Sequence, residues 1–331
     1  MRLARPFARP FDRPLARSSA AVLLLLAGLL AAVSSGPSAA GAATRYPVVY
    51  NIAAAYRVLL DPAAPPPGAN DFTCKPTAAH PRPVVLVHGL GATMGENWAT
   101  LAPLLANEGY CVFALTYGTA PGEQVVGGLA PMEDSSAELA AFVDRVLAAT
   151  GAAKVDLVGH SEGTVMPQWY LKFRGGAAKV NRYVAITPIY GGTTLDGIGA
   201  LAQTLTDAFP QYSRYFTGGF AKFCGSCLEF LRGSDFNRRL YDDGVYAVPG
   251  FTYTTIMTKY DELVTPYTSG RLAAPNATNI VIQKQCGLDY AEHVAVAFDP
   301  VVARDVLNAL DPAHRKPVPC RLVLPVVGAP L

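Results

Sequence analysis

The segment Gly159-His160-Ser161-Glu162-Gly163 combines residue types and a spacing that indicate nucleophilic chemistry. A serine with a glycine two residues before it and another two residues after it is typical of a nucleophile on a sharp turn between a strand and a helix. The glycines let strand and helix approach closely, while the serine backbone takes a strained conformation. A predicted strand at residues 154–158 precedes this turn, and residues 164–173 can continue as a helix. This context favours Ser161 as a nucleophile over an accidental turn residue.

A serine hydroxyl is a weak nucleophile and needs a neighbouring base, which a carboxylate orients. For a nucleophile of this kind, the order along the chain is serine, acid, histidine. The chain has five histidines, and His293 and His314 are the two that lie far enough downstream. His314 falls in the charged stretch 311–317, which is typical of solvated surface, whereas His293 follows the last expected strand and leads into a helix. We therefore predict His293 to be the base.

The acid is expected just after the preceding strand, which we predict at residues 251–258. Asp261 occupies that position, and its neighbour Glu262 is the local alternative. Asp289 lies only four residues before His293, which suits a cap for that loop or helix better than the acid. Chain order and spacing therefore predict Asp261 as the acid.

Ester and amide hydrolysis also needs backbone N–H groups that point at the negative oxygen of the tetrahedral intermediate. One such donor is the N–H of the residue after the nucleophile, here Glu162. The second comes from the loop after an early strand, which in this chain reads His88-Gly89-Leu90-Gly91. We predict the backbone N–H groups of Leu90 and Glu162 as the two oxyanion donors.

These residues need a scaffold, and the chain shows short apolar runs that alternate with helical stripes. Strands are expected at residues 83–88, 110–117, 154–158, 180–186, 251–258 and 279–284, and helices at residues 98–108 and 133–150. Strands that are apolar throughout indicate a mostly parallel sheet with helices on both faces. Such a sheet gathers its chemistry at the carboxyl ends of its strands. We predict a single α/β domain over residues 43–331.

One connection in this pattern is far longer than usual. We interpret residues 191–245, approximately, as a cap or lid inserted over the site. Residues 195–209 look amphipathic, and five aromatic residues follow: Tyr212, Tyr215, Phe216, Phe220 and Phe223. The aromatic residues would either form an acyl-binding wall that contacts lipid aggregates or pack in the ordinary way against the sheet. The sequence leaves both interpretations open.

The first 42 residues have a different character from the rest. The net charge of the whole chain is +2, but five arginines and one acidic residue fall within residues 1–17. An apolar run at residues 20–33 and the small-residue site Ala40-Gly41-Ala42 follow. This order predicts a secretory signal peptide at residues 1–42 and an extracellular protein. A membrane anchor is the alternative, but the apolar run is shorter than the roughly 20 residues that span a bilayer.

The remaining chain is nearly neutral, because loss of five basic residues and one acidic residue changes the net charge from +2 to −2. A nucleic-acid partner is therefore not expected, since such proteins gather many basic side chains. Transient contact with lipid aggregates would have to be hydrophobic. No obligate protein partner is inferred.

All six cysteines lie after the predicted signal peptide. An even number in an oxidising compartment favours disulfides, although six cysteines allow fifteen pairings. The simplest pairing joins nearest neighbours: Cys74–Cys111, Cys224–Cys227 and Cys286–Cys320. The spacing Cys224-Gly225-Ser226-Cys227 would also fit a redox dithiol or half of a zinc site, but no second motif of this kind follows. A structural disulfide is the favoured interpretation.

Taken together, four segments resemble the secreted class 2 triacylglycerol lipases of actinobacteria, within the α/β-hydrolase superfamily. They are VVLVHGLGAT (84–93), VDLVGHSEGTVMP (155–167), TKYDELVTPY (258–267) and the loop 286–293. The resemblance covers about residues 83–310. It implies an α/β-hydrolase fold and hydrolysis of acyl esters through an acyl-enzyme, with Ser161, Asp261 and His293 as the triad.

The same resemblance implies no cofactor for this chain. Related bacterial lipases carry a calcium site near the catalytic histidine, but its ligand pattern is not matched here, so no metal is carried over. Two other functions use the same fold: a secreted acyltransferase with the same triad, and a binding protein without activity.

Overall fold

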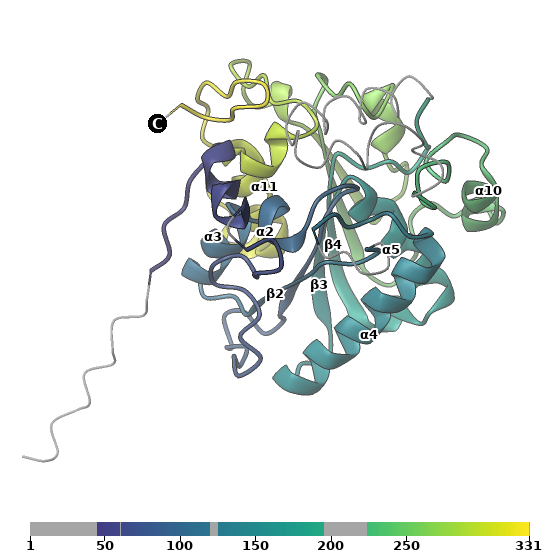
Figure 1. Cartoon of the computed structure of the whole chain (residues 1–331), viewed down its shortest axis with the longest axis horizontal. Coiled ribbons are helices and arrows are strands. Elements are labelled where there is room, and N and C mark those ends of the chain that lie inside the picture. The colour runs from purple at the N-terminus through teal and green to yellow at the C-terminus, as the bar shows by residue number, and fades with distance from the viewer. Residues whose placement is uncertain (1–44, 60, 120–124, 195–223, 331) are drawn as a thin grey trace, which may run out of the picture. The chain divides into compact units, whose positions relative to one another are not determined.

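The centre of the fold is a parallel sheet of six strands in the order β2-β1-β3-β4-β5-β6 (Figure 1). The computed structural model describes residues 45–59, 61–119, 125–194 and 224–330, and Tyr46–Leu331 group into one compact unit. The predicted signal peptide, the amphipathic stretch 195–209 and the five aromatic residues after it lie outside the described residues. The strands are β1 (Val84–Val87), β2 (Val112–Leu115), β3 (Val155–His160), β4 (Val180–Ile186), β5 (Thr252–Met257) and β6 (Ala277–Val281).

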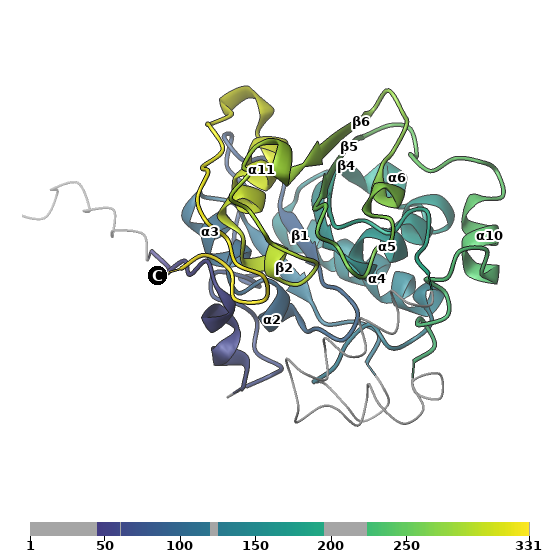
Figure 2. The ribbon, with the colours of Figure 1, turned by 90° about the horizontal axis from the view of Figure 1, so that it is seen from above.

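Helices cover both faces of this sheet. Figure 2 shows α4 (Met132–Thr150) and α5 (Glu162–Phe173) on one side, and α3 (Leu101–Asn107) and α11 (Pro300–Leu310) on the other. The short helices α2 (Met94–Asn97), α6 (Gly176–Lys179) and α10 (Asp235–Tyr241) complete the α-helices of the described chain. The 3-10 helices are η1 (Ile52–Leu59), η3 (Tyr267–Gly270), η4 (Ile282–Lys284), η5 (Ala295–Phe298) and η6 (Pro312–His314).

The helices on both faces explain why β1 and β2 are apolar throughout. Successive side chains of a strand point to opposite faces, so Val85 packs into the core with α4 and α5, whereas Val84 packs into the core with α3 and α11. All four residues of β1 are fully buried. The α/β-hydrolase fold class predicted from the sequence is therefore confirmed.

The ends of the elements follow local chemistry. Helix α4 stops at Gly151, whose φ of 74° is left-handed and favours glycine. Helix α11 begins after Asp299, whose carboxylate accepts a hydrogen bond from the N–H of Val301. The helix predicted at residues 98–108 begins later, at Leu101, and is α3.

The sixth strand is shorter than the prediction of residues 279–284. It ends at Val281, and Ile282 begins the 3-10 helix η4. The N–H groups of Gln285 and Cys286 both donate to the carbonyl oxygen of Ile282, so the chain turns there instead of extending. Ile282 is buried in the turn, which explains why an apolar residue there resembles a continuing strand.

Three disulfides tie the described chain together: Cys74–Cys111, Cys224–Cys227 and Cys286–Cys320. These are the nearest-neighbour pairs expected from the sequence. The first and third connect loops to the sheet region across 37 and 34 residues of chain. Within the described ranges, none of the helices combines the length and the apolar character needed to cross a membrane.

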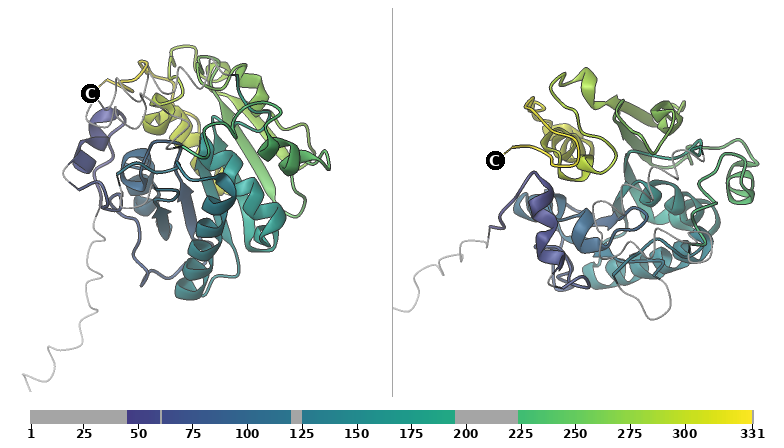
Figure 3. Two further views of the ribbon diagram at one scale, coloured as in Figure 1. Left: turned by 45° about the vertical axis from the view of Figure 1, so that its right-hand side comes forward. Right: turned by 45° about the horizontal axis from the view of Figure 1, so that its top comes forward.

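The two ends of the compact unit lie side by side. The N–H of Ile52 donates to the carbonyl oxygen of Val327 at 2.9 Å, and the N–H of Ala329 donates to that of Tyr50 at 2.8 Å. Figure 3 shows the C-terminal segment beside η1, the purple helix. Residues far apart in sequence therefore form one layer at this edge of the fold.

Candidate active site

Ser161 stands at the junction of β3 and α5 with φ 54° and ψ −119°. A positive φ is strained for a serine, and such strain persists only where the surrounding structure enforces it. Here the strand and helix are too close for larger residues. A Cβ atom on Gly159 would lie 1.7 Å from the carbonyl oxygen of Gly163, and one on Gly163 would lie 2.0 Å from that of Val87. The motif glycines are therefore required by backbone contact.

The three residues predicted for catalysis are in hydrogen-bond contact. Nε2 of His293 lies 2.7 Å from Oγ of Ser161, and Nδ1 of His293 lies 2.9 and 3.0 Å from the two carboxylate oxygens of Asp261. The carboxylate can only accept, so Nδ1 carries the proton of the neutral ring and Nε2 is free to accept from the serine hydroxyl. All three residues are buried.

Asp261, and not its neighbour Glu262, makes this contact. The N–H groups of Leu263 and Val264 donate to the Asp261 carboxylate at 3.0 and 2.8 Å, which fixes its orientation toward His293. Burial and then the nearby Glu292 raise the pKa of Glu262 to about 7. The two adjacent acids therefore have different environments.

His293 holds its proton more tightly than an ordinary histidine. Burial lowers its pKa, but the charge and hydrogen bond of Asp261, with the charges of Glu262 and Glu292, outweigh burial and the net pKa is raised. A base with a raised pKa is a stronger proton acceptor. The arrangement is therefore suited to take a proton from Ser161.

The two predicted oxyanion donors lie at the same place. Gly89, Leu90 and Ser161 line one cavity, and a Cβ atom on Gly89 would lie 2.9 Å from that of Ser161. In the part of the chain that the structure describes, neither the N–H of Leu90 nor that of Glu162 donates to a protein acceptor. Both donors are thus available to a substrate oxygen.

The Glu162 side chain adds a feature that the motif does not reveal. It is fully buried, and neither carboxyl oxygen has a hydrogen-bond partner among the residues described. Burial, followed by the charge of Glu229, raises the pKa of Glu162 well above its usual value. Both causes favour the neutral acid over the carboxylate. A carboxylate here would oppose negative charge at the neighbouring N–H groups.

His160 and Asn97 connect the loops around Ser161. Nε2 of His160 lies 2.9 Å from the carbonyl oxygen of His293, and its Nδ1 lies 3.0 Å from Oδ1 of Asn97. The same Oδ1 accepts a hydrogen bond from the N–H of Gly89 at 2.9 Å. Burial, then the charge of His293, lowers the pKa of His160 to about 3. A neutral ring carries a single N–H. With that proton on Nε2, His160 donates to the carbonyl oxygen of His293, and its Nδ1 lies beside Asn97 without donating to Oδ1.

The sequence motifs alone do not reveal this connection. Asn97 ends α2, and α2 begins with a capping box in which Thr93 and Glu96 exchange hydrogen bonds. The capping signature Thr-x-x-Glu is visible in the sequence and marks the helix that carries Asn97. The position of His160 inside the serine motif is the other available signal.

His314 and Asp289, the alternatives considered for the base and the acid, make other contacts. His314 is exposed, and its ring contacts Asp311. Asp289 is buried, and its carboxylate accepts from the N–H of Ala291 in the loop before His293, which is the capping contact expected from the sequence.

Among the described residues, no group of three or more His, Cys, Asp or Glu side chains could hold a metal ion.

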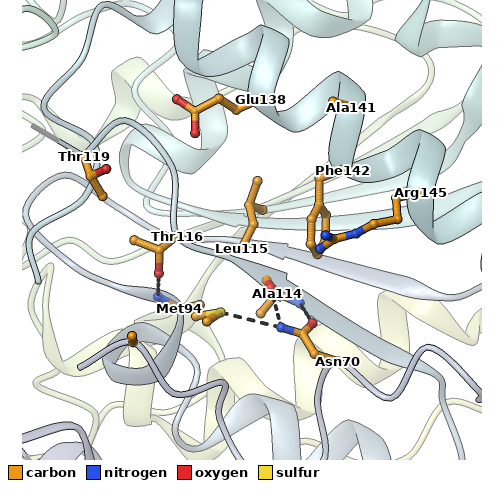
Figure 4. Close-up of a pocket in the computed structure, with 11 residues that line it drawn as sticks. Asn70, Met94, Ala114, Leu115, Thr116, Thr119, Glu138, Ala141, Phe142 and Arg145 are labelled. Carbon is orange, nitrogen blue, oxygen red and sulfur yellow. Dashed lines mark hydrogen bonds between the residues drawn. The ribbon is translucent and has the colours of Figure 1, made fainter. Parts of the chain in front are cut away.

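Two cavities differ in their relation to this site. A cavity of about 60 Å³ lies beside Ser161 and His293, with mostly apolar walls. A larger one of about 590 Å³ lies beside the edge strand β2, where it is lined by Asn70, Glu138 and Arg145 among others. Figure 4 shows the larger cavity, with the Asn70 amide bonded to the backbone of Ala114.

Comparisons with known proteins agree with the fold and the motif. The model of the lipase (class 2) family matches residues 81–304. Over 91 residues, the chain is 35% identical to a triacylglycerol lipase of Pseudarthrobacter phenanthrenivorans and 35% identical to one of Burkholderia plantarii. Each alignment covers 26% of this chain, and 27% and 24% of the two relatives, so the match spans about a quarter of their length.

A solved structure shares the architecture. Aspergillus fumigatus lipase B superposes with a TM-score of 0.55, over 78% of this chain and 57% of that chain. The sequence identity is 20%, so this likeness concerns the fold alone.

Proposed function

The chain belongs to the lipase (class 2) family, and from this premise we propose that it is a secreted serine hydrolase of carboxylic esters, a lipase or esterase that cleaves acylglycerols or other acyl esters. The observation that carries the proposal is the contact of Ser161 with His293 at 2.7 Å and of His293 with Asp261 at 2.9 Å. Assignment to the actinobacterial branch of the family rests on the four sequence segments alone and stays a prediction.

The first half-reaction transfers the acyl group to the protein. Nε2 of His293 takes the hydroxyl proton as Oγ of Ser161 forms a bond to the ester carbonyl carbon, and the carbonyl electron pair moves onto its oxygen. Asp261 stabilises the imidazolium that results. When the tetrahedral intermediate collapses, the bond to the alkoxy oxygen breaks, His293 gives its proton to that oxygen and the alcohol leaves.

The second half-reaction restores the serine. His293 takes a proton from water as the water oxygen bonds to the acyl carbon, and a second tetrahedral intermediate forms. Collapse of this intermediate breaks the bond to Oγ, which takes the proton back from His293. The products are the carboxylic acid and free Ser161.

Each tetrahedral intermediate carries a negative oxygen, which the N–H groups of Leu90 and Glu162 would stabilise. Loss of one such donor in hydrolases of this type reduces kcat about 100- to 1,000-fold. The burial of the Glu162 side chain and the raised pKa of its carboxyl group support this role, because both disfavour a protein anion beside the donors.

An extracellular location is supported by the predicted signal peptide and by the three disulfides, which persist in oxidising compartments. An apolar cavity beside Ser161 supports an acyl-ester substrate. Hydrophobic contact with lipid aggregates, without an obligate protein partner, remains part of the proposal.

Replacement of Ser161 by alanine tests the proposal. Purified wild-type protein is expected to hydrolyse p-nitrophenyl butyrate and to be labelled covalently at Ser161 by an alkyl phosphonate, which mass spectrometry of the peptide detects. In S161A the labelling should be lost and kcat should fall about a million-fold, to the residual rate that substrate binding and the oxyanion donors support. Ser269→Ala is the matched control, because Ser269 lies outside the triad. If S161A keeps wild-type ester hydrolysis, the proposal is wrong.

A further inference from the structure

The cavity beside Ser161 has a wall that comes from outside the part of the chain matched by the family model. Ile52 and Ala55 of η1 line the cavity, whereas the family match begins at residue 81. Ala55 also packs with Ala297 and Phe298 of η5 in a small apolar cluster. The helix η5 directly follows the loop of His293, so both helices stand next to the proposed reaction centre.

The η1 helix is fixed to the rest of the fold at several points. Backbone hydrogen bonds join Tyr50 and Ile52 to the C-terminal segment, residues 327–329. The hydroxyl of Thr100 donates to the carbonyl oxygen of Val49 at 2.6 Å. These bonds connect η1 to two separate parts of the fold, so its inner side chains keep a defined position beside the cavity.

The C-terminal segment is also bonded to the histidine loop. The Glu292 carboxylate accepts from the N–H of Val326 at 2.8 Å and from that of Ala295 at 2.9 Å. Glu292 is adjacent to His293 in sequence. One continuous set of hydrogen bonds therefore joins η1, the C-terminal segment and the loop that carries the proposed base.

The residue sizes at this wall determine the space. Ala55 and Ala297 are small, and the larger Ile52 and Phe298 border the same cavity. The cavity is small, at about 60 Å³, so the volume of the side chains at its wall limits how much of a substrate it can hold. The walls are apolar, which suits an alkyl chain and offers little to a polar group.

We propose that η1 and η5 form the binding wall for an alkyl chain of the ester and limit the length of that chain. The inference rests on the proposed ester hydrolysis at Ser161 and deepens it by assigning substrate size to named residues. The chain in question is either the acyl group or the alkoxy group, because both flank the reacting carbonyl carbon.

Side-chain volume at the wall is the variable to change. Ala55→Leu fills the cavity, whereas Ile52→Ala and Phe298→Ala enlarge it. The quantity measured is the ratio of kcat/KM for a C8 ester to kcat/KM for a C2 ester. We expect this ratio to rise about tenfold in the enlarged variants and to fall about tenfold in A55L. A factor of about ten is the lower limit of the discrimination that one methylene group gives in an apolar pocket. Tyr56→Ala is the matched control, because Tyr56 belongs to the same helix but is 63% exposed.

Two substrate series identify which chain occupies the wall. The first varies the acyl group of p-nitrophenyl esters from acetate to palmitate, and the second varies the alcohol of acetate esters from methyl to octyl. A change of ratio in the first series assigns the wall to the acyl chain, and a change in the second assigns it to the alkoxy chain. An unchanged ratio in both series would overturn the inference.

Stability and activity controls separate the possible failures. Ile52→Val is a smaller change than I52A, and its ratio should lie between those of wild type and I52A if volume is the cause. The melting temperature is measured for every variant. If Y56A shifts the ratio as strongly as I52A, or if all esters change by one factor, the wall has no role in selection. Ester hydrolysis that survives in S161A would instead contradict the proposed function itself.

Discussion

The small cavity at Ser161 and the large cavity at β2 lie at the carboxyl ends of two strands of one sheet, yet they are built for different tasks. The large cavity has about ten times the volume, 590 against 60 Å³. Its lining includes Asn70, Thr116 and Glu138 but no histidine, serine or cysteine. The small one is lined by Ser161 and His293. Cavity volume alone is therefore a poor guide to the reacting groups in this fold.

Their polar groups also differ in how they are used. At the large cavity, Asn70 pairs its amide with both the N–H and the carbonyl of Ala114 and so closes the edge of β2. The Arg145 guanidinium lies over the rings of Phe72 and Phe142. At the small cavity, the bonds of His160 and Asn97 converge on the loops around Ser161. One region stabilises structure, and the other orients the residues that we propose to react.

The largest effect that tests this difference is expected at Asp261. Asp261→Asn should lower kcat about 10,000-fold, because an amide no longer selects the ring tautomer of His293 that accepts the serine proton. Glu262→Gln should change kcat far less, since Glu262 acts on His293 through its charge alone. Glu138→Gln, at the large cavity, is the control. Steady-state kinetics on p-nitrophenyl butyrate measures all three, and equal losses in D261N and E262Q would contradict the assignment.

The pH dependence of activity gives a second comparison of Glu262 with Glu138. The base must be neutral, so activity is present above the pKa of His293 and is lost as pH falls through it. Because Glu262 helps to raise that pKa, E262Q should move the acid limb of kcat/KM toward lower pH. E138Q should leave the limb in place, as Glu138 is not among the groups that act on His293.

A smaller effect is expected at His160. His160→Ala removes the contact with the His293 carbonyl, and a displacement of the base by about 1 Å costs about 100-fold in rate. We expect kcat to fall 10- to 100-fold with KM changed less than about twofold, and His160→Gln to recover part of the loss because its amide can donate to the same carbonyl. Kinetics over a range of substrate concentrations measures both constants.

Asn70→Ala provides the matched deletion at the large cavity. This change removes two hydrogen bonds between the Asn70 side chain and the backbone of Ala114. Neither bond involves a loop beside Ser161. We expect a lower melting temperature with kcat unchanged. A loss of kcat in N70A as large as that in H160A would show that any buried hydrogen bond has this effect, and the distinction between the two regions would fail.

Much of the small cavity could be predicted from the sequence because its residues follow strands in a fixed order. Ser161, Asp261 and His293 each stand after a strand, and the carboxyl ends of parallel strands meet at one edge. Strands β1 and β2 are short and apolar throughout, which made them visible, whereas β3 to β6 also carry polar residues. Several boundaries were misplaced by one to three residues, among them the start of α3 at Leu101 and the end of β6 at Val281. At Ile282 the reason is that burial in a 3-10 turn and burial in a strand demand the same residue type.

The contribution of η1 could not be predicted in the same way. Its position depends on backbone hydrogen bonds to residues 327–329, and backbone bonds leave no residue pattern in the sequence. The contact of Asn97 with Gly89 and His160 likewise depends on how α2 is placed over β3. Contacts between segments distant in sequence set the surroundings of the site, whereas local motifs identify its reacting groups.

The smallest expected effect concerns stability at Glu96, which lines the small cavity. Burial raises the pKa of Glu96 to about 7, against hydrogen bonds from Thr93 that lower it. The folded protein therefore binds more protons than the unfolded chain between about pH 4.5 and pH 7, so the free energy of unfolding falls as pH rises through this window. Glu96→Gln keeps an acceptor for the N–H of Thr93 and removes the titration. Urea unfolding at both pH values should then show a pH dependence reduced by roughly 3 kcal/mol, whereas a slope equal to that of wild type would mean that Glu96 is ionised in the folded protein.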